Sequence, residues 1–213
     1  VLLHVLHGAI KAQPLVLVVP AASPIKSVQE LVAQYKGKPA SLMAGNSGTG
    51  TLAHLAAELF EAETGVALTP VPYRGESALM PDLISGQVSL GFLNLPSVAV
   101  HIKRGKLRAL AGSSPLPVAD LPGVPTFRSL NHPSLEVQGW AALVAPKGSI
   151  PEEGLVRLEG LLTKALASDA VKARFASLNV APVSQSRLAT GQFLKAEGAR
   201  YGEVIKARGI KPE

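Results

Sequence analysis

The chain has 213 residues, of which 47% are hydrophobic, 17% are charged and none is cysteine. This composition excludes an intrinsically disordered chain, and the lack of cysteine excludes a disulfide framework or a thiolate metal site. The formal net charge is +6, but the basic residues are scattered and only 4% of residues are aromatic, so no nucleic acid partner is predicted.

Three features of the sequence concern targeting and the start of the chain. The sequence contains no apolar run of about 18 residues, so no membrane span is expected. Residues 1–10 lack the basic segment and cleavage site of a signal peptide. The chain does not begin with methionine, so Val1 is not expected to be the natural start.

Strand-like and helix-like segments alternate in the first half of the chain. An apolar run at 15–19 predicts a buried strand, and Ser27 with Glu30 forms a capping box for a helix over 28–35. Further strands are predicted at 40–43, 66–73, 88–93 and 107–111, and further helices at 52–64, 77–84 and 98–103. Gly65 is expected to end the helix that precedes it. The alternation is typical of an α/β fold with parallel βαβ crossovers.

The second half has a different pattern. Residues 113–133 are rich in proline and serine and predict a long surface connection. Strand character follows at 135–144, which includes Trp140, the single tryptophan. The remainder is predicted to be helical, with an apolar face over 155–166, a short helix that Ser168 caps and that reaches Leu178, and a helix over 188–205.

The strongest functional signal is a loop between the strand at 40–43 and the helix at 52–64. It contains three glycines and three hydroxyl residues in the segment GNSGTGT, 45–51. A helix that begins after such a loop can bind an anion, because its first N–H groups lack intrahelical partners and its dipole is positive there. Thr49 or Thr51 could cap the helix or donate a hydroxyl to a ligand. A capped turn without a ligand is the alternative, and Gly48, Gly50 and Ala53 also match the dinucleotide pattern G-x-G-x-x-A.

Other candidate residues follow from the predicted sheet. His54, one turn into the helix, is predicted either to contact the ligand or to orient the loop through a backbone hydrogen bond. Residues 73–75 should lie beside the loop, because the carboxyl ends of parallel strands meet at one edge. Arg74 could then pair with a carboxylate or simply face solvent. Asn94 ends the next strand, where its amide could contact a ligand or cap the helix near Pro96.

No catalytic or metal-binding set is predicted. Ser47 as nucleophile with His54 as base lacks both the G-x-S-x-G pattern and an acid that would orient the histidine. The sequence has no H-E-x-x-H motif, and His4 and His7, three residues apart, are weak evidence of a metal site. No cofactor is predicted either.

Several stretches together resemble one family, in a single order from about residue 15 to the end. They are VVPAASPIKSVQEL (18–31), GNSGTGT (45–51) with 54–56, VPYRG (71–75), DLISGQV (82–88), NLPS (94–97), HIKRGKLRALA (101–111), PGVPT (122–126), GWAALVAP (139–146) and IKARGIKPE (205–213). The ordered set resembles the Bug, or TctC-type, solute-binding receptors of tripartite tricarboxylate transporters.

The resemblance implies an α/β periplasmic binding protein, type II-like, with two Rossmann-like lobes and a ligand cleft. Lobe two would be 21–106, while 1–20 and 107–213 would form the remainder of lobe one with hinge strands and C-terminal helices. It implies a small carboxylate ligand, membrane permease subunits as partners and no enzymatic activity. The carried-over ligand-binding positions are Ser47, Gly48, Thr49, Gly50, Thr51, His54, Tyr73, Arg74, Gly75 and Asn94.

The sequence also departs from the family pattern. The family opens with a proline- and glycine-rich loop in lobe one, so the first lobe is expected to be incomplete in this chain. Leu93 stands where an acid is often found, and Arg74 stands where lysine is usual. Two alternatives stay open: an NADP-dependent enzyme that uses Gly48-Thr49-Gly50 for pyrophosphate, and a truncated remnant that binds no ligand.

Overall fold

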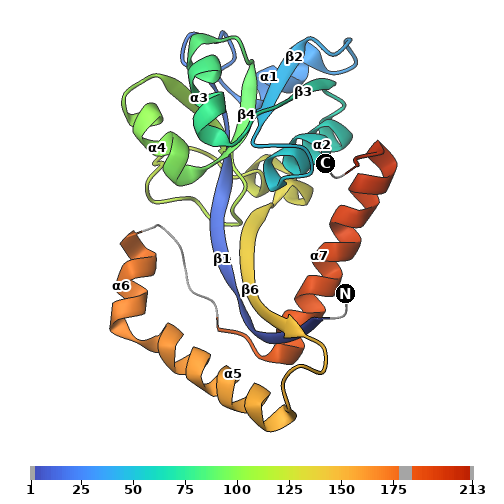
Figure 1. Ribbon diagram of the computed structural model, residues 1–213. Helices are drawn as coiled ribbons and strands as arrows, with labels where there is room; N and C mark the ends of the chain where they lie inside the picture. Colours follow the sequence, from blue (N-terminus) through green and yellow to red (C-terminus); the bar gives the residue numbers. More distant parts are fainter. Residues whose placement is uncertain (1–2, 178–183, 212–213) are drawn as a thin grey trace. The chain divides into compact units, whose positions relative to one another are not determined.

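The computed structural model describes residues 3–177 and 184–211 of the chain (Figure 1). These residues belong to two compact units, each described here by itself. The sheet unit consists of Pro14–Gln138 and Glu203–Glu213, and the helical unit of Val1–Gln13 and Gly139–Gly202. Within the described ranges, no helix has the length and apolar character needed to cross a membrane.

The strands form a mixed sheet rather than a parallel one. They are β1 (Leu3–Pro20), β2 (Leu42–Asn46), β3 (Leu68–Pro72), β4 (Leu90–Asn94), β5 (Leu107–Gly112) and β6 (Gln138–Pro146). The order is β3-β2-β4-β1-β5, with β6 paired to β1. Strand β2 is parallel to β3 and β4, as predicted, but β1 is antiparallel to β4 and β5 and separates them. Strands β4 and β5 are therefore parallel to each other, as the predicted crossover requires, but β1 lies between them.

The helices of the sheet unit largely follow the predicted pattern. They are α1 (Val28–Tyr35), α2 (Leu52–Thr64), α3 (Glu76–Ser85) and α4 (Leu95–Lys103), followed by the short 3-10 helices η1 (Arg128–Leu130) and η2 (Pro133–Leu135). Ser27 caps α1 by accepting a hydrogen bond of 3.1 Å from the Glu30 N–H. The Glu30 carboxylate accepts from the N–H of Lys26, one residue earlier than in a regular capping box. Gly65 ends α2 with φ of 73°, as predicted.

The core of the sheet unit lies on both faces of the sheet. Alternating residues of β1 point to opposite faces, because side chains alternate along a strand. One face packs against α3 and α4 through a cluster that includes Val16, Val18, Leu79, Leu93 and Val98. On the other, three buried phenylalanines from α2, β4 and the segment before η1 contact one another: Phe60, Phe92 and Phe127 have ring centroids 5.8–6.3 Å apart.

The helical unit has few buried side chains among those described. Its helices are α5 (Glu152–Ala167), α6 (Asp169–Ser177) and α7 (Arg187–Arg208), whose last residues belong to the sheet unit. Ser168 caps α6 by accepting a bond of 3.4 Å from the Val171 N–H, as predicted, whereas the predicted helical residue Leu178 lies outside the described residues. Arg187 links α7 to α5 through ion pairs with Glu152 and Glu159, at 2.6 and 3.0 Å.

Candidate ligand-binding site

Three helices begin at the same edge of the sheet. Because β2, β3 and β4 are parallel, their carboxyl ends meet there, and α2, α3 and α4 each follow one of these strands (Figure 1). The first N–H groups of each helix lack intrahelical acceptors, and each helix dipole is positive at this end. This carboxyl edge therefore offers several donors to an anionic ligand.

The glycine-rich loop at the end of β2 is held by its own side chains. Asn46 is 1% exposed, and its Oδ1 accepts a hydrogen bond of 3.0 Å from the Gly48 N–H. The Thr51 hydroxyl donates to the Gly48 carbonyl at 2.7 Å and accepts from the Ser47 hydroxyl at 3.4 Å. Gly50 has φ of 76°, a conformation that favours glycine. The loop thus has a fixed shape that its sequence supports.

Several N–H groups of this loop and helix remain available. Thr51 is the N-cap residue of α2, but its side chain makes no capping hydrogen bond, and the Thr49 hydroxyl makes none either. Of the two roles predicted for these threonines, capping of the helix is not observed, because the Thr51 hydroxyl instead closes the loop onto Gly48. Within the described residues, the N–H groups of Thr49, Leu52 and Ala53 have no hydrogen-bond acceptor. These three N–H groups are free to donate hydrogen bonds at the start of α2.

His54 supports the loop. The residue is 6% exposed, and its Nδ1 lies 3.0 Å from the Gly50 nitrogen and accepts the hydrogen bond of that N–H. Its Nε2 lies 3.4 Å from Oε1 of Glu58, one turn further along α2. Of the two predicted roles, the loop-orienting hydrogen bond is the one observed. Each ring nitrogen has a contact: Nδ1 with the Gly50 N–H and Nε2 with the Glu58 carboxylate.

Residues 73–75 lie beside this loop, as predicted. The Tyr73 N–H donates to the Asn46 carbonyl at 3.0 Å, which joins the two strand ends. The Tyr73 hydroxyl donates to Asp82 at 2.7 Å, and this bond, with some burial, raises the pKa of Tyr73 to about 12. Arg74 is exposed and has no ion-pair or hydrogen-bond partner among the described residues. Gly75, with φ of 96°, is the N-cap of α3.

Asn94 lies at the same edge, and of its two predicted roles the helix cap is not observed. It is the N-cap residue of α4 but its side chain makes no capping bond. Instead, its backbone N–H and its Nδ2 both donate to Oε1 of Glu76, each at 2.9 Å. Glu76 is the first residue of α3, so this carboxylate links the start of α3 to the start of α4. Leu93, which precedes Asn94, is fully buried in the core.

The predicted site residues therefore meet at one edge of the sheet. All ten positions, from Ser47 to Asn94, lie in or next to the loops that follow β2, β3 and β4. Sequence reasoning missed three residues that hold these loops, namely Asn46, Glu58 and Glu76. An asparagine two residues before a glycine is a known turn signal and could have identified Asn46. No local pattern indicates Glu76, because its partner Asn94 is 18 residues away.

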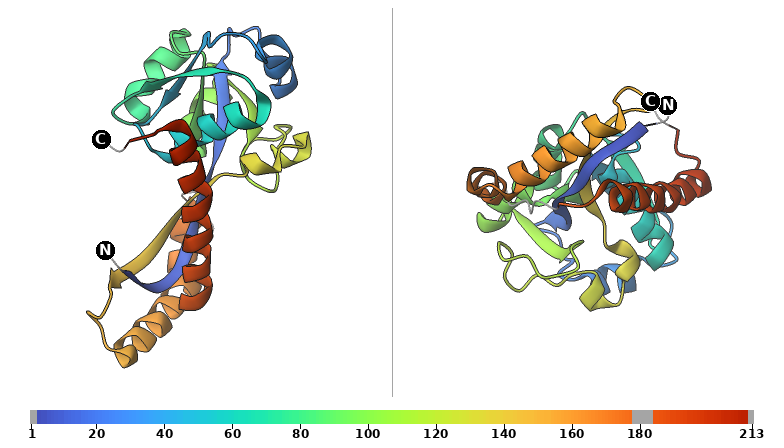
Figure 2. Two further views of the ribbon diagram at one scale, coloured as in Figure 1. Left: turned by 90° about the vertical axis from the view of Figure 1, so that its right-hand side faces the viewer. Right: turned by 90° about the horizontal axis from the view of Figure 1, so that it is seen from below.

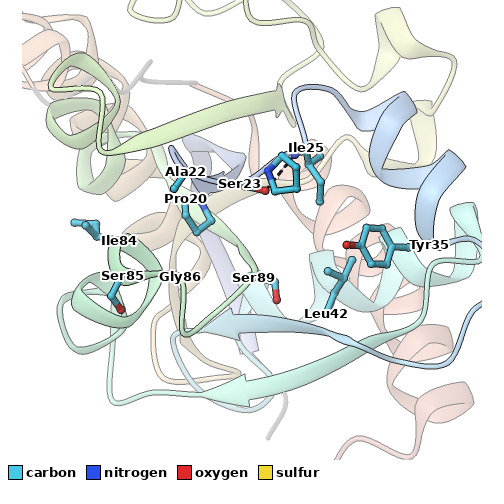
Figure 3. Close-up of a pocket in the computed structure, with 11 residues that line it drawn as sticks. Pro20, Ala22, Ser23, Ile25, Tyr35, Leu42, Ile84, Ser85, Gly86 and Ser89 are labelled. Atoms are coloured by element: carbon cyan, nitrogen blue, oxygen red, sulfur yellow. Dashed lines mark hydrogen bonds between the residues drawn. The ribbon is translucent and has the colours of Figure 1, made fainter.

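A separate cavity of about 310 Å³ lies at the opposite edge (Figure 3). It is lined by the end of β1 and the loop that follows it, the end of α1, the start of β2, the end of α3 and the residue before β4. Its polar lining includes Ser23, Ser85 and Ser89, whose hydroxyls bond to nearby backbone groups. None of the predicted site residues lines it. Across the described residues, no cluster of three or more His, Cys, Asp or Glu side chains could hold a metal ion.

Comparison with known proteins identifies the family. The profile of the family described as "Tripartite tricarboxylate transporter family receptor" (TctC) matches residues 5–210. The chain is 36% identical over 198 residues to the protein BugT of Bordetella pertussis, which covers 93% of this chain and 60% of BugT. It is 32% identical over 193 residues to a UPF0065 protein of Pseudomonas sp. strain P51. This match covers 90% of this chain and 57% of that protein.

Solved structures agree with this assignment. An R. palustris protein solved with adipate has a TM-score of 0.82 and 30% identity, with 99% of this chain and 70% of that chain covered. The fold is also that of BugD, with a TM-score of 0.80 at 24% identity over 99% of this chain and 71% of that chain. The chain spans about 60% of the length of BugT and of the Pseudomonas protein. The protein belongs to the TctC, or Bug, family of tripartite tricarboxylate transporter receptors.

Proposed function

We propose that this protein is a solute-binding receptor that captures a small organic acid at the carboxyl edge of β2, β3 and β4. The observation that carries the proposal is the set of unpaired N–H groups at the start of α2. Arg74, exposed and without a partner among the described residues, lies on the adjoining loop. A carboxylate accepts hydrogen bonds only, and it matches both the backbone donors and the guanidinium fork.

The ligand class follows from the relatives and from this chemistry. The R. palustris neighbour, 30% identical, is solved with adipate, a dicarboxylate. We extend that class to this chain because its loop presents donors rather than acceptors. The proposal keeps the ten predicted ligand-binding residues. Its direct contacts are the Arg74 side chain and the free N–H groups of Thr49, Leu52 and Ala53, the last two in the first turn of α2. The side chains of His54, Tyr73 and Asn94 would act by holding the loops in place.

The wider proposal concerns lobes and partners. Residues 21–106 would form one ligand-binding lobe, and 1–20 with 107–213 would belong to the other lobe. A ligand that contacts both lobes would favour the closed state, because it gains contacts there that the open state lacks. The receptor would act in the periplasm and deliver its ligand to the membrane permease subunits of a tripartite tricarboxylate transporter. The proposal assigns it no cofactor, no metal and no catalytic step.

Calorimetric titration of the 213-residue chain tests this proposal. The probes are adipate, its uncharged analogue adipamide, and NADPH. We expect adipate to bind and adipamide not to bind, because the site selects negative charge rather than chain length. Binding of NADPH alone would overturn the proposal in favour of an enzyme, and no binding of any carboxylate would favour a remnant without a ligand.

Arg74→Gln tests the proposed side-chain contact. Loss of a charged hydrogen bond should weaken adipate binding about tenfold. Arg104→Gln is the matched control, because Arg104 is an exposed arginine at the carboxyl end of α4, away from this edge. Equal affinity in the Arg74→Gln variant and the parent protein would remove Arg74 from the site.

A further inference from the structure

A continuous line of polar contacts leads from the glycine-rich loop to the end of the chain. It begins at the Gly50 N–H, passes through His54 and Glu58 on α2, and reaches Arg208 in the last turn of α7. Arg208 belongs to the sheet unit, and this end of α7 lies beside α2 (Figure 2). The line therefore connects two segments that are far apart in sequence but belong to one compact unit.

The two contacts of His54 fix the state of its ring. Nδ1 accepts the Gly50 N–H, so this nitrogen carries no proton. The single proton of the neutral ring is then on Nε2, which faces the Glu58 carboxylate at 3.4 Å. If the ring rotated or changed tautomer, the Gly50 N–H would face a donor or nothing. The position of Gly50 therefore depends on the carboxylate that orients the ring.

That carboxylate is in turn oriented by Arg208. Oε2 of Glu58 lies 3.1 Å from Nε of Arg208, while Oε1 faces the histidine. Nη1 of Arg208 binds Glu61 at 2.8 Å, and the other oxygen of Glu61 accepts the Leu68 N–H at the start of β3. Glu58 and Glu61 are three residues apart on one helix face, where like charges repel. Without the guanidinium, repulsion from Glu61 would favour a Glu58 side chain that turns towards solvent and no longer contacts His54.

We propose that Arg208 is a positioning residue, which holds the glycine-rich loop in its ligand-ready shape through Glu58 and His54. The consequence for ligand binding rests on the proposed function, because it takes this loop to be the carboxylate site. The positioning itself does not, since it concerns the state of His54 and Gly50 in the protein without ligand. A planar guanidinium suits the role because it can bind two carboxylates at once, which an ammonium does less well.

The test compares Arg208→Gln with the parent chain by nuclear magnetic resonance. The readouts are the tautomer of His54, from the shifts of its ring nitrogens, and the hydrogen exchange of the Gly50 amide. We expect the variant to lose the single Nε2–H tautomer and to exchange the Gly50 amide about tenfold faster. Exchange of the β4 amides should not change, so the effect is distinct from a general loss of stability. Adipate affinity should fall about threefold.

Two further variants make the test specific. Lys206→Gln removes the same charge two residues earlier, from a side chain with no partner among the described residues, and should behave like the parent. Arg208→Lys keeps the charge and should give intermediate Gly50 exchange; it also replaces Arg208→Gln as the test if that variant does not fold. Unchanged His54 and Gly50 signals would overturn the positioning role, as would an equal effect of Lys206→Gln. If the parent does not bind adipate, the receptor proposal fails, while the Gly50 comparison still decides the positioning role.

Discussion

At the scale of single residues, the site is built by polar side chains that bind backbone groups. Asn46 and His54 are buried, yet each accepts an N–H from the glycine-rich loop. Because their acceptor atoms already bind the loop, these atoms are not available to a ligand. Under the proposed function, the groups left to bind the ligand are mainly backbone N–H groups, together with the Arg74 side chain. A site of this kind recognises negative charge through loop shape, so its side-chain composition says little about the particular solute.

The negative charge of Glu76 is expected to repel the anionic ligand of the proposed site. Its carboxylate lies at the start of α3, at the edge where we place the anionic ligand, and it accepts two hydrogen bonds from Asn94. Glu76→Gln keeps an oxygen acceptor for Asn94 and removes the negative charge. We expect adipate to bind about twofold more tightly, because the repulsion between like charges near solvent is small but real.

Calorimetric titration of the Glu76→Gln variant at low and high salt would check this. Added salt should reduce the difference in adipate affinity between the variant and the parent, because screening weakens interactions between exposed charges. Glu153→Gln is the control, since it makes the same change in the first turn of α5. Unchanged or weaker binding by Glu76→Gln would show that the carboxylate does not oppose the ligand.

At the scale of elements, sequence patterns predicted segments better than their arrangement. The helices at 28–35 and 52–64 have the predicted bounds, because caps and apolar periodicity are local signals. The apolar run at 15–19 predicted a buried strand, but not that β1 lies between β4 and β5 and is antiparallel to both. Strand order depends on contacts between residues such as Val16 and Leu93, which no local window contains. The prediction that the loops after β2 and β3 lie at one edge of the sheet was confirmed, because it required only that these strands be parallel.

One contact between elements predicts a dependence of stability on pH. Glu63 near the end of α2 accepts a hydrogen bond of 2.8 Å from Ser134 in η2, and its other oxygen lies 3.3 Å from His132. The hydrogen bond from Ser134, followed by that with His132, lowers the pKa of Glu63 below its usual 4.5. A carboxyl with a lowered pKa in the folded state stabilises the protein above the unfolded-state pKa. That contribution is lost as pH falls through the folded-state value.

Glu63→Gln should therefore lower the free energy of unfolding at pH 7 by about 0.5 kcal/mol, a small value because the pair is partly exposed. The difference from the parent should shrink towards zero as the pH falls through the lowered folded-state pKa of Glu63, because the carboxyl is then protonated in both the folded and the unfolded state. Urea denaturation at pH 7 and pH 3.5 would measure it, with Glu153→Gln as the control. A difference that persists unchanged at pH 3.5 would show that the effect does not come from the Glu63 charge.

At the scale of the whole molecule, the two units differ in how much apolar surface they bury. The sheet unit has a core on both faces of its sheet, including fully buried leucines and three clustered phenylalanines. In the helical unit, the described side chains that are buried are Ala145, Leu155 and Thr190. Several large apolar side chains of the same unit are exposed, among them Leu143, Val144, Val156, Leu161 and Leu188. Burial supplies most of the free energy that offsets chain entropy, so the helical unit is expected to be the less stable one.

Native-state hydrogen exchange would measure this difference directly. Amides exchange through local or global opening, and protection reaches the global free energy of unfolding only where opening exposes a packed core. The amides of residues 15–19 in β1 and of β4 should exchange slowly, because their side chains are buried almost completely. The amides of α5 and α6 should exchange faster, although they are also hydrogen-bonded, because opening these helices exposes little additional apolar surface. Mass spectrometry of peptic fragments separates the two sets, and equal protection in both would show that burial in the helical unit is greater than these side chains indicate.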